Sequence, residues 1–161
     1  QLVGPGGHVH AYEIDPDLAR RASENLVQNG NVTVHARSAL DGPMPPSGVI
    51  YVSAGVTHVP DVWLDTLRPG GRLVVPLTPA ERLGCMLLVT RQPDVAYAAR
   101  IFSTAGFIPC VGARDERQSR ALAAALDART SDDVRSLRRG HEPDETAWYS
   151  GDGWWLSTAP P

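Results

Sequence analysis

Cysteine and basic residues are both scarce in this sequence, and each shortage excludes a class of protein. The 161 residues include two cysteines, Cys85 and Cys110, which are too few for a disulfide framework. Lysine and arginine number 15 against 18 acidic residues, so the net charge of −3 argues against a nucleic-acid-binding protein. No apolar run reaches the roughly 18 residues of a transmembrane helix, so we expect no membrane contact. Since no secretory signal pattern precedes the cysteines, we predict a reduced, cytoplasmic protein.

The composition is that of a globular domain. Hydrophobic residues make up 42% and charged residues 20% of a 17.3 kDa chain. The sequence starts at Gln1 rather than at methionine and at once enters the breaker cluster Gly4-Pro5-Gly6-Gly7. This start is typical of the end of one element followed by a turn, so we expect a fragment of a longer gene product.

Strands and helices alternate over the first half of the chain. Asp15 and Pro16 supply an N-cap and a proline at the first helical position, and Gly30 is expected to end that helix. The order of strand, helix, strand, strand, helix and strand predicts a parallel sheet covered by helices. The expected strands are 8–14, 31–36, 49–52 (buried on both faces) and 72–77, and the second helix runs from Pro60 to the breaker Pro69-Gly70-Gly71.

The pattern changes beyond Pro79. Residues 84–91 and 99–111 both read as strands, which predicts an antiparallel pair at a sheet edge. Asp115 and Gln118 have the spacing of a capping box, which predicts a helix that continues to residue 128.

The last 31 residues add a predicted helix and a hairpin. Ser131 is placed to cap a short helix whose last turn carries Arg138 and Arg139. Residues 148–158 have the pattern of a hairpin that turns at Gly151-Asp152-Gly153. Three tryptophans in this hairpin indicate either a small core or an exposed surface for a peptide or partner, and core packing is the favoured interpretation. They are Trp148, Trp154 and Trp155.

Four segments between Gly6 and Pro79 together resemble a known family. They are His10–Pro16, Asn31–Val34, Val49–Pro60 and Leu67–Pro76. In this combination they resemble the class I S-adenosylmethionine-dependent methyltransferases, and more narrowly the protein-L-isoaspartate O-methyltransferase family. Phe107–Gly112 is similar to a segment near that family's C-terminal edge.

The resemblance implies an α/β fold. The expected architecture is a Rossmann-like methyltransferase sheet that lacks its first strand, with an antiparallel edge pair and a C-terminal helical and hairpin extension. Residues 1–112 would form the methyltransferase-like core, and residues 113–161 an extension of unknown role.

Two departures from the family pattern stand out. The family's Gly-x-Gly-x-Gly loop should precede Glu13 by roughly 20 residues, but only 12 residues stand before it. The family's substrate-contacting Ser or Thr also lies upstream, so the catalytic residue is unknown here. Arg37-Ser38-Ala39 stands where the family has Gly-Asp-Gly. We therefore expect the isolated chain to be inactive, with either a second chain or a longer gene product completing the sheet.

The resemblance assigns five residues to the cofactor S-adenosylmethionine. Glu13 would accept hydrogen bonds from the ribose hydroxyls, and Ser38 would bond the amine of adenine. The alternatives are an ordinary polar residue at a strand end and a plain loop serine. The expected cofactor-binding set is Glu13, Ile14, Ser38, Ala39 and Ser53.

Thr57 and His58 are the expected substrate-side residues. His58 could orient the acceptor carboxylate or act as a general base, although a surface or capping histidine is the favoured interpretation. His8 and His10 lie on one face of a predicted strand and could form half of a metal site, but no other ligand pattern accompanies them, so we expect no metal.

These residues lead to one functional hypothesis and two alternatives. The main hypothesis is methyl transfer from S-adenosylmethionine to a protein or peptide carboxylate, with an L-isoaspartyl residue in protein repair as the favoured acceptor. One alternative is a non-catalytic interaction module that docks a partner on its Trp-rich tail. The other is a methyltransferase that tailors a peptide.

Overall fold

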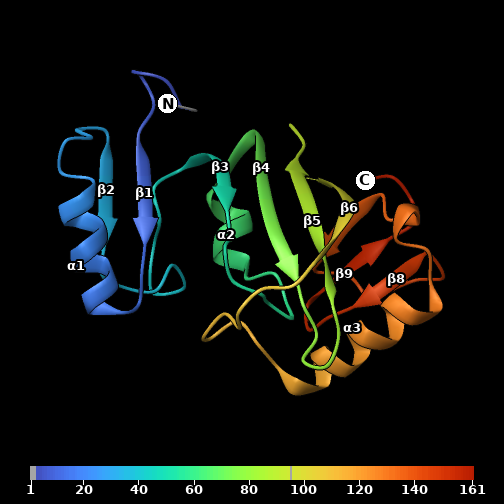
Figure 1. Cartoon of the computed structure of the whole chain (residues 1–161). Helices are drawn as coiled ribbons and strands as arrows, with labels where there is room; N and C mark the ends of the chain where they lie inside the picture. Colours follow the sequence, from blue (N-terminus) through green and yellow to red (C-terminus); the bar gives the residue numbers. More distant parts are fainter. Residues whose placement is uncertain (1–2, 95) are drawn as a thin grey trace. The chain divides into compact units, whose positions relative to one another are not determined.

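The computed structural model describes residues 3–94 and 96–161, which divide into two compact units (Figure 1). One unit extends to Met44 and the other begins at Pro45. The predicted turn at the chain start begins at Gln1, outside the described residues. From Gly4 onward it is present, because the Gly7 N–H donates to the Gly4 carbonyl at 3.3 Å.

The first unit is a strand–helix–strand element. Strands β1 (Val9–Tyr12) and β2 (Val32–His35) pair in parallel, and α1 (Pro16–Asn25) connects them. Asp15 caps α1 as predicted, since its Oδ1 accepts from the N–H groups of Asp17 and Leu18 at 2.9 and 3.0 Å. The predicted end of the helix at Gly30 is wrong. The helix stops at Asn25 and is followed by turns, in which the N–H groups of Val27 and Asn29 donate to the carbonyls of Glu24 and Leu26 at 3.5 and 2.8 Å.

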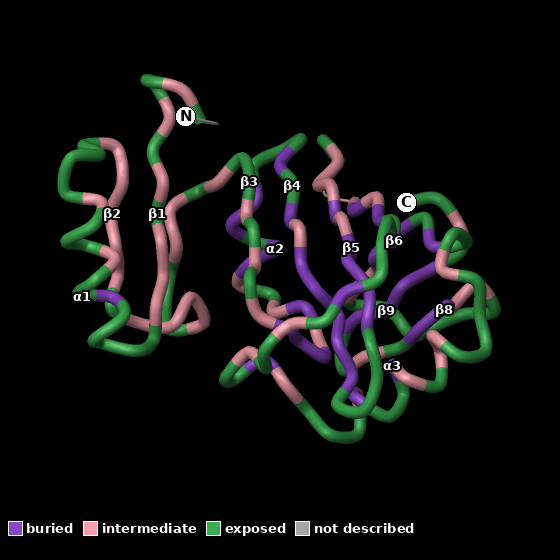
Figure 2. Tube along the Cα trace, in the orientation of Figure 1, coloured by how far each residue is buried: buried purple, intermediate pink, exposed green. Residues whose placement is uncertain are grey.

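The second unit contains a seven-stranded sheet with the order β3-β4-β5-β6-β7-β9-β8. Strands β3 and β4 are parallel, which confirms that prediction, and all other neighbours are antiparallel. Figure 2 shows buried residues along β4, β5 and the hairpin β8–β9, and only exposed or intermediate residues on β3. The elements are β3 (Ser47–Tyr51), α2 (Asp61–Thr66), β4 (Leu67–Leu77), β5 (Gly84–Arg91), β6 (Tyr97–Ala105), α3 (Glu116–Ala128), η1 (Ser131–Asp133), β7 (Ser136–Arg139), β8 (Ala147–Ser150) and β9 (Trp154–Ser157).

Strand β3 differs from its predicted environment. It was expected to be buried on both faces, but Val49 and Tyr51 are 58% and 63% exposed. The reason is topological: among the described residues β3 has one strand neighbour, β4, and so forms an edge of this sheet. The apolar residues of β3 are therefore typical of a central strand, although β3 is an edge strand of this sheet.

The antiparallel pair β5–β6 is present but does not end the sheet. Strand β7 adds to β6 through Tyr97 and Ala98, and the hairpin β8–β9 continues beyond it. The predicted division at residue 112 followed the extent of the family resemblance. The compact units divide after Met44, and the strands after residue 112 extend the sheet that begins with β3.

The prediction of a short helix from Ser131 to Arg139 is wrong. A 3-10 turn covers Ser131–Asp133, and the next element is strand β7. The two arginines before Gly140 resembled the basic last turn of a helix, but long-range pairing with β6 and β9 decides the conformation. Arg139 then ties β7 to α2 by donating to Asp61 at 2.9 Å and Asp65 at 2.5 Å.

The tryptophan-rich hairpin is part of the core. Trp148, Trp154 and Trp155 are 1%, 4% and 2% exposed. The indole N–H of Trp148 donates to the carbonyl of Thr130 at 3.0 Å. The favoured interpretation is confirmed, and the alternative of an exposed tryptophan docking surface is wrong.

No helix in the described part of the chain is long and apolar enough to cross a membrane.

Candidate functional site

Strands β1 and β2 are parallel, and Tyr12 is in register with His35, so the carboxyl ends of both strands lie on the same side of their sheet. We call this side the carboxyl edge. Glu13 follows β1 directly, and its N–H donates to the His35 carbonyl at 3.1 Å. Its Oε1 accepts from the Asp15 N–H at 2.9 Å. Within the described chain Glu13 Oε2 has no hydrogen-bond partner. The bond from Asp15 thus holds the carboxylate in place and leaves Oε2 available as an acceptor at this edge.

Next to Glu13, Ile14 holds an apolar side chain that is 51% exposed. Ser38 follows β2, and its Oγ accepts from the Leu40 N–H at 3.0 Å. Arg37 donates to the carbonyls of Ser38 and Pro43, both at 3.1 Å, which fixes the loop after β2. The fold therefore brings Glu13, Ile14, Ser38 and half-buried Ala39 to the same edge of one sheet, and their role in cofactor binding stays a prediction.

The histidines of this unit are paired with neighbours. His8 Nε2 lies 2.8 Å from Thr33 Oγ1, and His10 Nδ1 lies 3.0 Å from His35 Nε2. No group of three or more His, Cys, Asp or Glu side chains within residues 3–94 and 96–161 is placed to hold a metal ion.

In the second unit, the loop that follows β3 contains Ser53, the second residue after the strand, which is exposed. Gly55 anchors this loop, because its N–H donates to Ile108 O at 2.7 Å and its carbonyl accepts from Cys110 N at 2.9 Å. A Cβ on Gly55 would lie 1.9 Å from Thr78 Oγ1, so only glycine fits here. The loop is thus fixed from both sides before it reaches Thr57.

Thr57 is completely buried, at 0% exposure. Its Oγ1 accepts from the Asp115 N–H at 2.8 Å, and its carbonyl accepts from the Tyr149 hydroxyl at 3.1 Å. Only one of the two hydrogen bonds of the predicted capping box is present: Asp115 Oδ1 accepts from Gln118 N at 2.8 Å. The Asp115 N–H donates to Thr57 Oγ1 and not to the Gln118 side chain. Thr57 holds the loop against α3 and β8, and its predicted contact with substrate stays a prediction.

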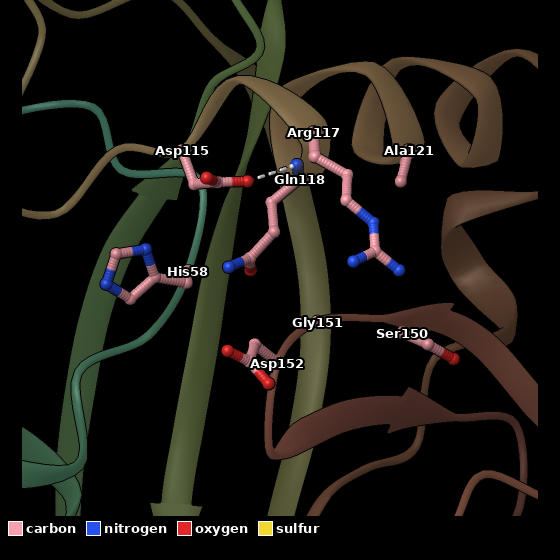
Figure 3. A pocket seen from close by; sticks show the side chains of 8 residues that line it. All are labelled: His58, Asp115, Arg117, Gln118, Ala121, Ser150, Gly151 and Asp152. Carbon is pink, nitrogen blue, oxygen red and sulfur yellow. Dashed lines mark hydrogen bonds between the residues drawn. The ribbon is translucent and has the colours of Figure 1, made fainter.

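His58 lies at a cavity of about 570 Å³ in the second unit (Figure 3). Burial lowers the pKa of the imidazole, and the nearby carboxylates of Asp115 and Asp152 oppose that shift only in part. Its Nδ1 is buried and has no hydrogen-bond partner in the described structure. The cavity is lined by His58, Asp115, Arg117, Gln118, Ala121, Ser150, Gly151 and Asp152.

Sequence reasoning found His58 but missed the other side of this cavity. Asp115 and Gln118 attracted attention only as a helix start, and Asp152 only as part of a turn. No local pattern could have joined the start of α3 to the β8–β9 turn, because their proximity depends on how the hairpin extends the sheet.

The lowered pKa of His58 predicts a pH dependence of stability. Because the folded state disfavours the charged imidazole, the unfolded chain binds the proton more readily near the ordinary value of 6.5. The contribution of His58 to stability is therefore fully present above about pH 6.5 and is lost as the pH falls below that value. We expect the free energy of unfolding to fall between about pH 7.5 and about pH 5.5, and His58→Gln to make the slope shallower.

Urea titrations at several pH values measure this slope, and NMR measures the imidazole titration directly. A His58 midpoint above 6.5, or an unchanged slope in His58→Gln, would contradict the assignment.

Comparisons with known proteins agree with this fold. The sequence model of the family described as protein-L-isoaspartate(D-aspartate) O-methyltransferase matches residues 1–115. A protein-L-isoaspartate O-methyltransferase from Ignicoccus hospitalis is 33% identical over 115 residues, which are 69% of this chain and 54% of that protein. One from Aeropyrum pernix is 32% identical over 123 residues, covering 73% of this chain and 47% of that protein.

Solved structures support the same fold. A structure of a protein-L-isoaspartate O-methyltransferase covers 96% of this chain and 57% of its own, with a TM-score of 0.62 and 19% identity. A Plasmodium falciparum protein of the same description, in complex with S-adenosyl-L-homocysteine, covers 63% of this chain and 51% of its own, with a TM-score of 0.55 and 16% identity. The chain spans about half the length of the curated relatives given above.

Proposed function

Because the chain belongs to the protein-L-isoaspartate O-methyltransferase family, we propose that it takes part in methyl transfer from S-adenosylmethionine to the carboxylate of L-isoaspartyl residues in proteins. The observation that carries the proposal is the held carboxylate of Glu13 at the carboxyl edge of β1 and β2. Ligands of open α/β sheets bind at this edge. The match covers residues 1–115, which contain every residue assigned below.

The residues of the first unit fit a nucleoside. Glu13 Oε2 is free to accept a hydrogen bond from a ribose hydroxyl, while Oε1 stays bonded to Asp15. Ile14 offers an exposed apolar surface for the adenine ring, next to Ser38 and Ala39 on the neighbouring loop. Ser38 Oγ has a second lone pair for the adenine amine besides the one used by Leu40. When bound, S-adenosylmethionine supplies an electrophilic methyl group on its sulfonium.

The residues of the second unit fit the acceptor side. Ser53, which the family resemblance assigns to the cofactor, is exposed near the start of the loop and can also donate to a carboxylate. His58 lies farther along the loop and has a ring nitrogen without a hydrogen-bond partner in the described structure. An acceptor carboxylate is already ionised at neutral pH, so no general base is required and positioning can supply the rate. We assign Thr57 to holding His58 in place rather than to contacting the substrate.

We further propose that the β1–β2 sheet needs an additional strand to bind cofactor tightly. Among the described residues β1 pairs with β2 alone and β3 with β4 alone, so each has an edge that a further strand could use. The strand could come from a second chain or from elsewhere in the gene product. We also propose that the substrates are proteins, that methyl transfer serves their repair, and that the protein is cytoplasmic.

A pair of peptides tests the acceptor. The two peptides differ only in an isoaspartyl or an aspartyl residue, and NMR shifts of the 161-residue chain are followed as each is added. We expect saturable shifts at Ser53 and His58 with the isoaspartyl peptide and none with its aspartyl counterpart. Equal shifts with both peptides would refute isoaspartyl as the acceptor.

A further inference from the structure

The connection between α1 and β2 contains the dipeptide Asn29-Gly30, the one place in the sequence where glycine follows asparagine. Both residues are exposed and lie outside the helix and the strand. A Cβ on Gly30 would meet no atom within 4 Å, so the space around this position is open. Within residues 3–94 and 96–161, neither the carboxamide of Asn29 nor the N–H of Gly30 takes part in a hydrogen bond.

A carboxamide carbon and the backbone nitrogen of the next residue are an electrophile and a nucleophile held a few bonds apart. They react when the nitrogen is sterically open and its N–H is not engaged in a hydrogen bond. Glycine meets the first condition best, because it has no Cβ and lets the backbone rotate into the reactive geometry. The open turn at Asn29-Gly30 meets both conditions.

The other two asparagines of the chain are protected by hydrogen bonds. Asn25 is followed by Leu26, whose N–H donates to a carbonyl of α1 at 3.0 Å. Asn31 is followed by Val32, whose N–H donates to a carbonyl of the turn at 3.0 Å. The carboxamide of Asn31 is held as well, since its Nδ2 donates to the Gly7 carbonyl at 3.0 Å. Neither following residue is glycine, so both nitrogens are also shielded by a side chain.

We propose that Asn29 is a site of spontaneous deamidation that converts it to aspartyl and isoaspartyl residues. Hydroxide removes the Gly30 amide proton, and the nitrogen attacks Cγ of Asn29. The bond from Cγ to the carboxamide nitrogen breaks, ammonia leaves with a proton from water, and a cyclic succinimide remains. Water then opens the ring: cleavage between the Gly30 nitrogen and Cγ gives aspartate, and cleavage between that nitrogen and the α-carbonyl carbon gives isoaspartate. Water is consumed and ammonia released, with no change in oxidation state.

Two aspartates also precede glycine, in Asp41-Gly42 and Asp152-Gly153. They can form the same succinimide, but a carboxylate repels the attacking nitrogen anion, whereas the carboxamide of Asn29 is neutral. We therefore expect isoaspartate to accumulate at residue 29 before it does at either aspartate.

The isoaspartyl form changes the backbone where the first sheet begins. Its main chain passes through Cβ and Cγ of residue 29 and so gains a methylene group. Two residues later, the Asn31 carbonyl accepts from the Val9 N–H at 2.9 Å, at the start of the β1–β2 pairing. We therefore expect the Val9 amide to exchange with solvent faster in the isoaspartyl form than in the parent.

Peptide mapping of the 161-residue chain after incubation at mildly alkaline pH tests the proposal. Mass spectrometry detects a mass gain equal to the difference between water and ammonia, and electron-transfer fragmentation distinguishes isoaspartyl from aspartyl products. We expect the product at Asn29 to form about tenfold or more faster than at Asn25 or Asn31, and to include isoaspartate.

A glycine variant identifies the attacking nitrogen. Gly30→Ala should slow deamidation of Asn29 about tenfold, because the added Cβ shields the nitrogen. The variant should keep the fold, since Gly30 is not in the left-handed region and the space beside it is open. Gly6→Ala is the matched control: it makes the same change at an exposed, open position of the same unit and should leave the rate unchanged.

Equal rates at the three asparagines, or an unchanged rate in Gly30→Ala, would overturn the proposal. A rate in the folded chain far below that of a short peptide spanning residues 26–32 would also overturn it, because the fold would then protect this turn. None of these outcomes bears on methyl transfer, since the reaction uses only water.

Discussion

Replacing Trp155 with alanine should lower the free energy of unfolding of the second unit by about 3–5 kcal/mol. The indole is 2% exposed, and its strand β9 lies between β7 and β8 in the sheet. The guanidinium of Arg138 stacks 5.0 Å from the ring centroid, which adds a cation–π contact on one face. A cavity of indole size in the middle of three strands is costly because the neighbours cannot close it.

Urea unfolding followed by far-UV circular dichroism measures the loss. Phe102→Ala is the matched control, since it removes an aromatic ring that is 45% exposed in β6 of the same sheet and should cost roughly 1 kcal/mol or less. If Trp155→Ala and Phe102→Ala cost the same, the hairpin is not an integral part of this sheet, and the β8–β9 turn would lose its support for Asp152.

Replacing Glu13 with glutamine should weaken binding of S-adenosyl-L-homocysteine about tenfold or more. Glutamine can keep the hydrogen bond that the Asp15 N–H makes to Oε1, but it places an NH₂ group where Oε2 accepts. A charge-assisted hydrogen bond to the ribose is thereby lost, which corresponds to about 1.5–3 kcal/mol. Glu13→Gln should therefore affect ligand binding rather than the stability of the fold.

Calorimetric titration of the chain and of the variant measures the difference. Glu24→Gln is the control, because it makes the same charge change on α1 of the same unit, where Glu24 pairs with Arg20 at 2.8 Å. We expect Glu24→Gln to bind as the parent does. Equal affinity of the parent and Glu13→Gln would refute the assignment of Glu13 to the ribose.

The elements that the sequence predicted well have strong local signals. Asp15 and Pro16 begin α1, and Asp115 begins α3, because an N-cap side chain bonds to the helix that it starts. The parallel pairs follow from alternation along the chain, and they place Glu13 and Ser38 at one edge. The place of these two residues at one edge could therefore be predicted from residues close in sequence, and their role in cofactor binding stays a prediction.

The elements that were predicted wrongly depend on distant partners. Strand β7 has the basic residues of a helix end, and only its pairing with β6 and β9 makes it a strand. The exposure of Val49 depends on which strand lies next to β3, which no local pattern contains. The same holds for Asp152, whose place at the His58 cavity follows from the path of the whole hairpin.

The most direct test of the central claim is a map of NMR shifts on addition of S-adenosyl-L-homocysteine. The account predicts weak binding, with a Kd above about 0.1 mM for the isolated chain, and the largest shifts in the first unit at Glu13, Ile14, Ser38 and Ala39. No shifts at millimolar ligand, or shifts confined to residues away from the carboxyl edge of β1 and β2, would contradict it.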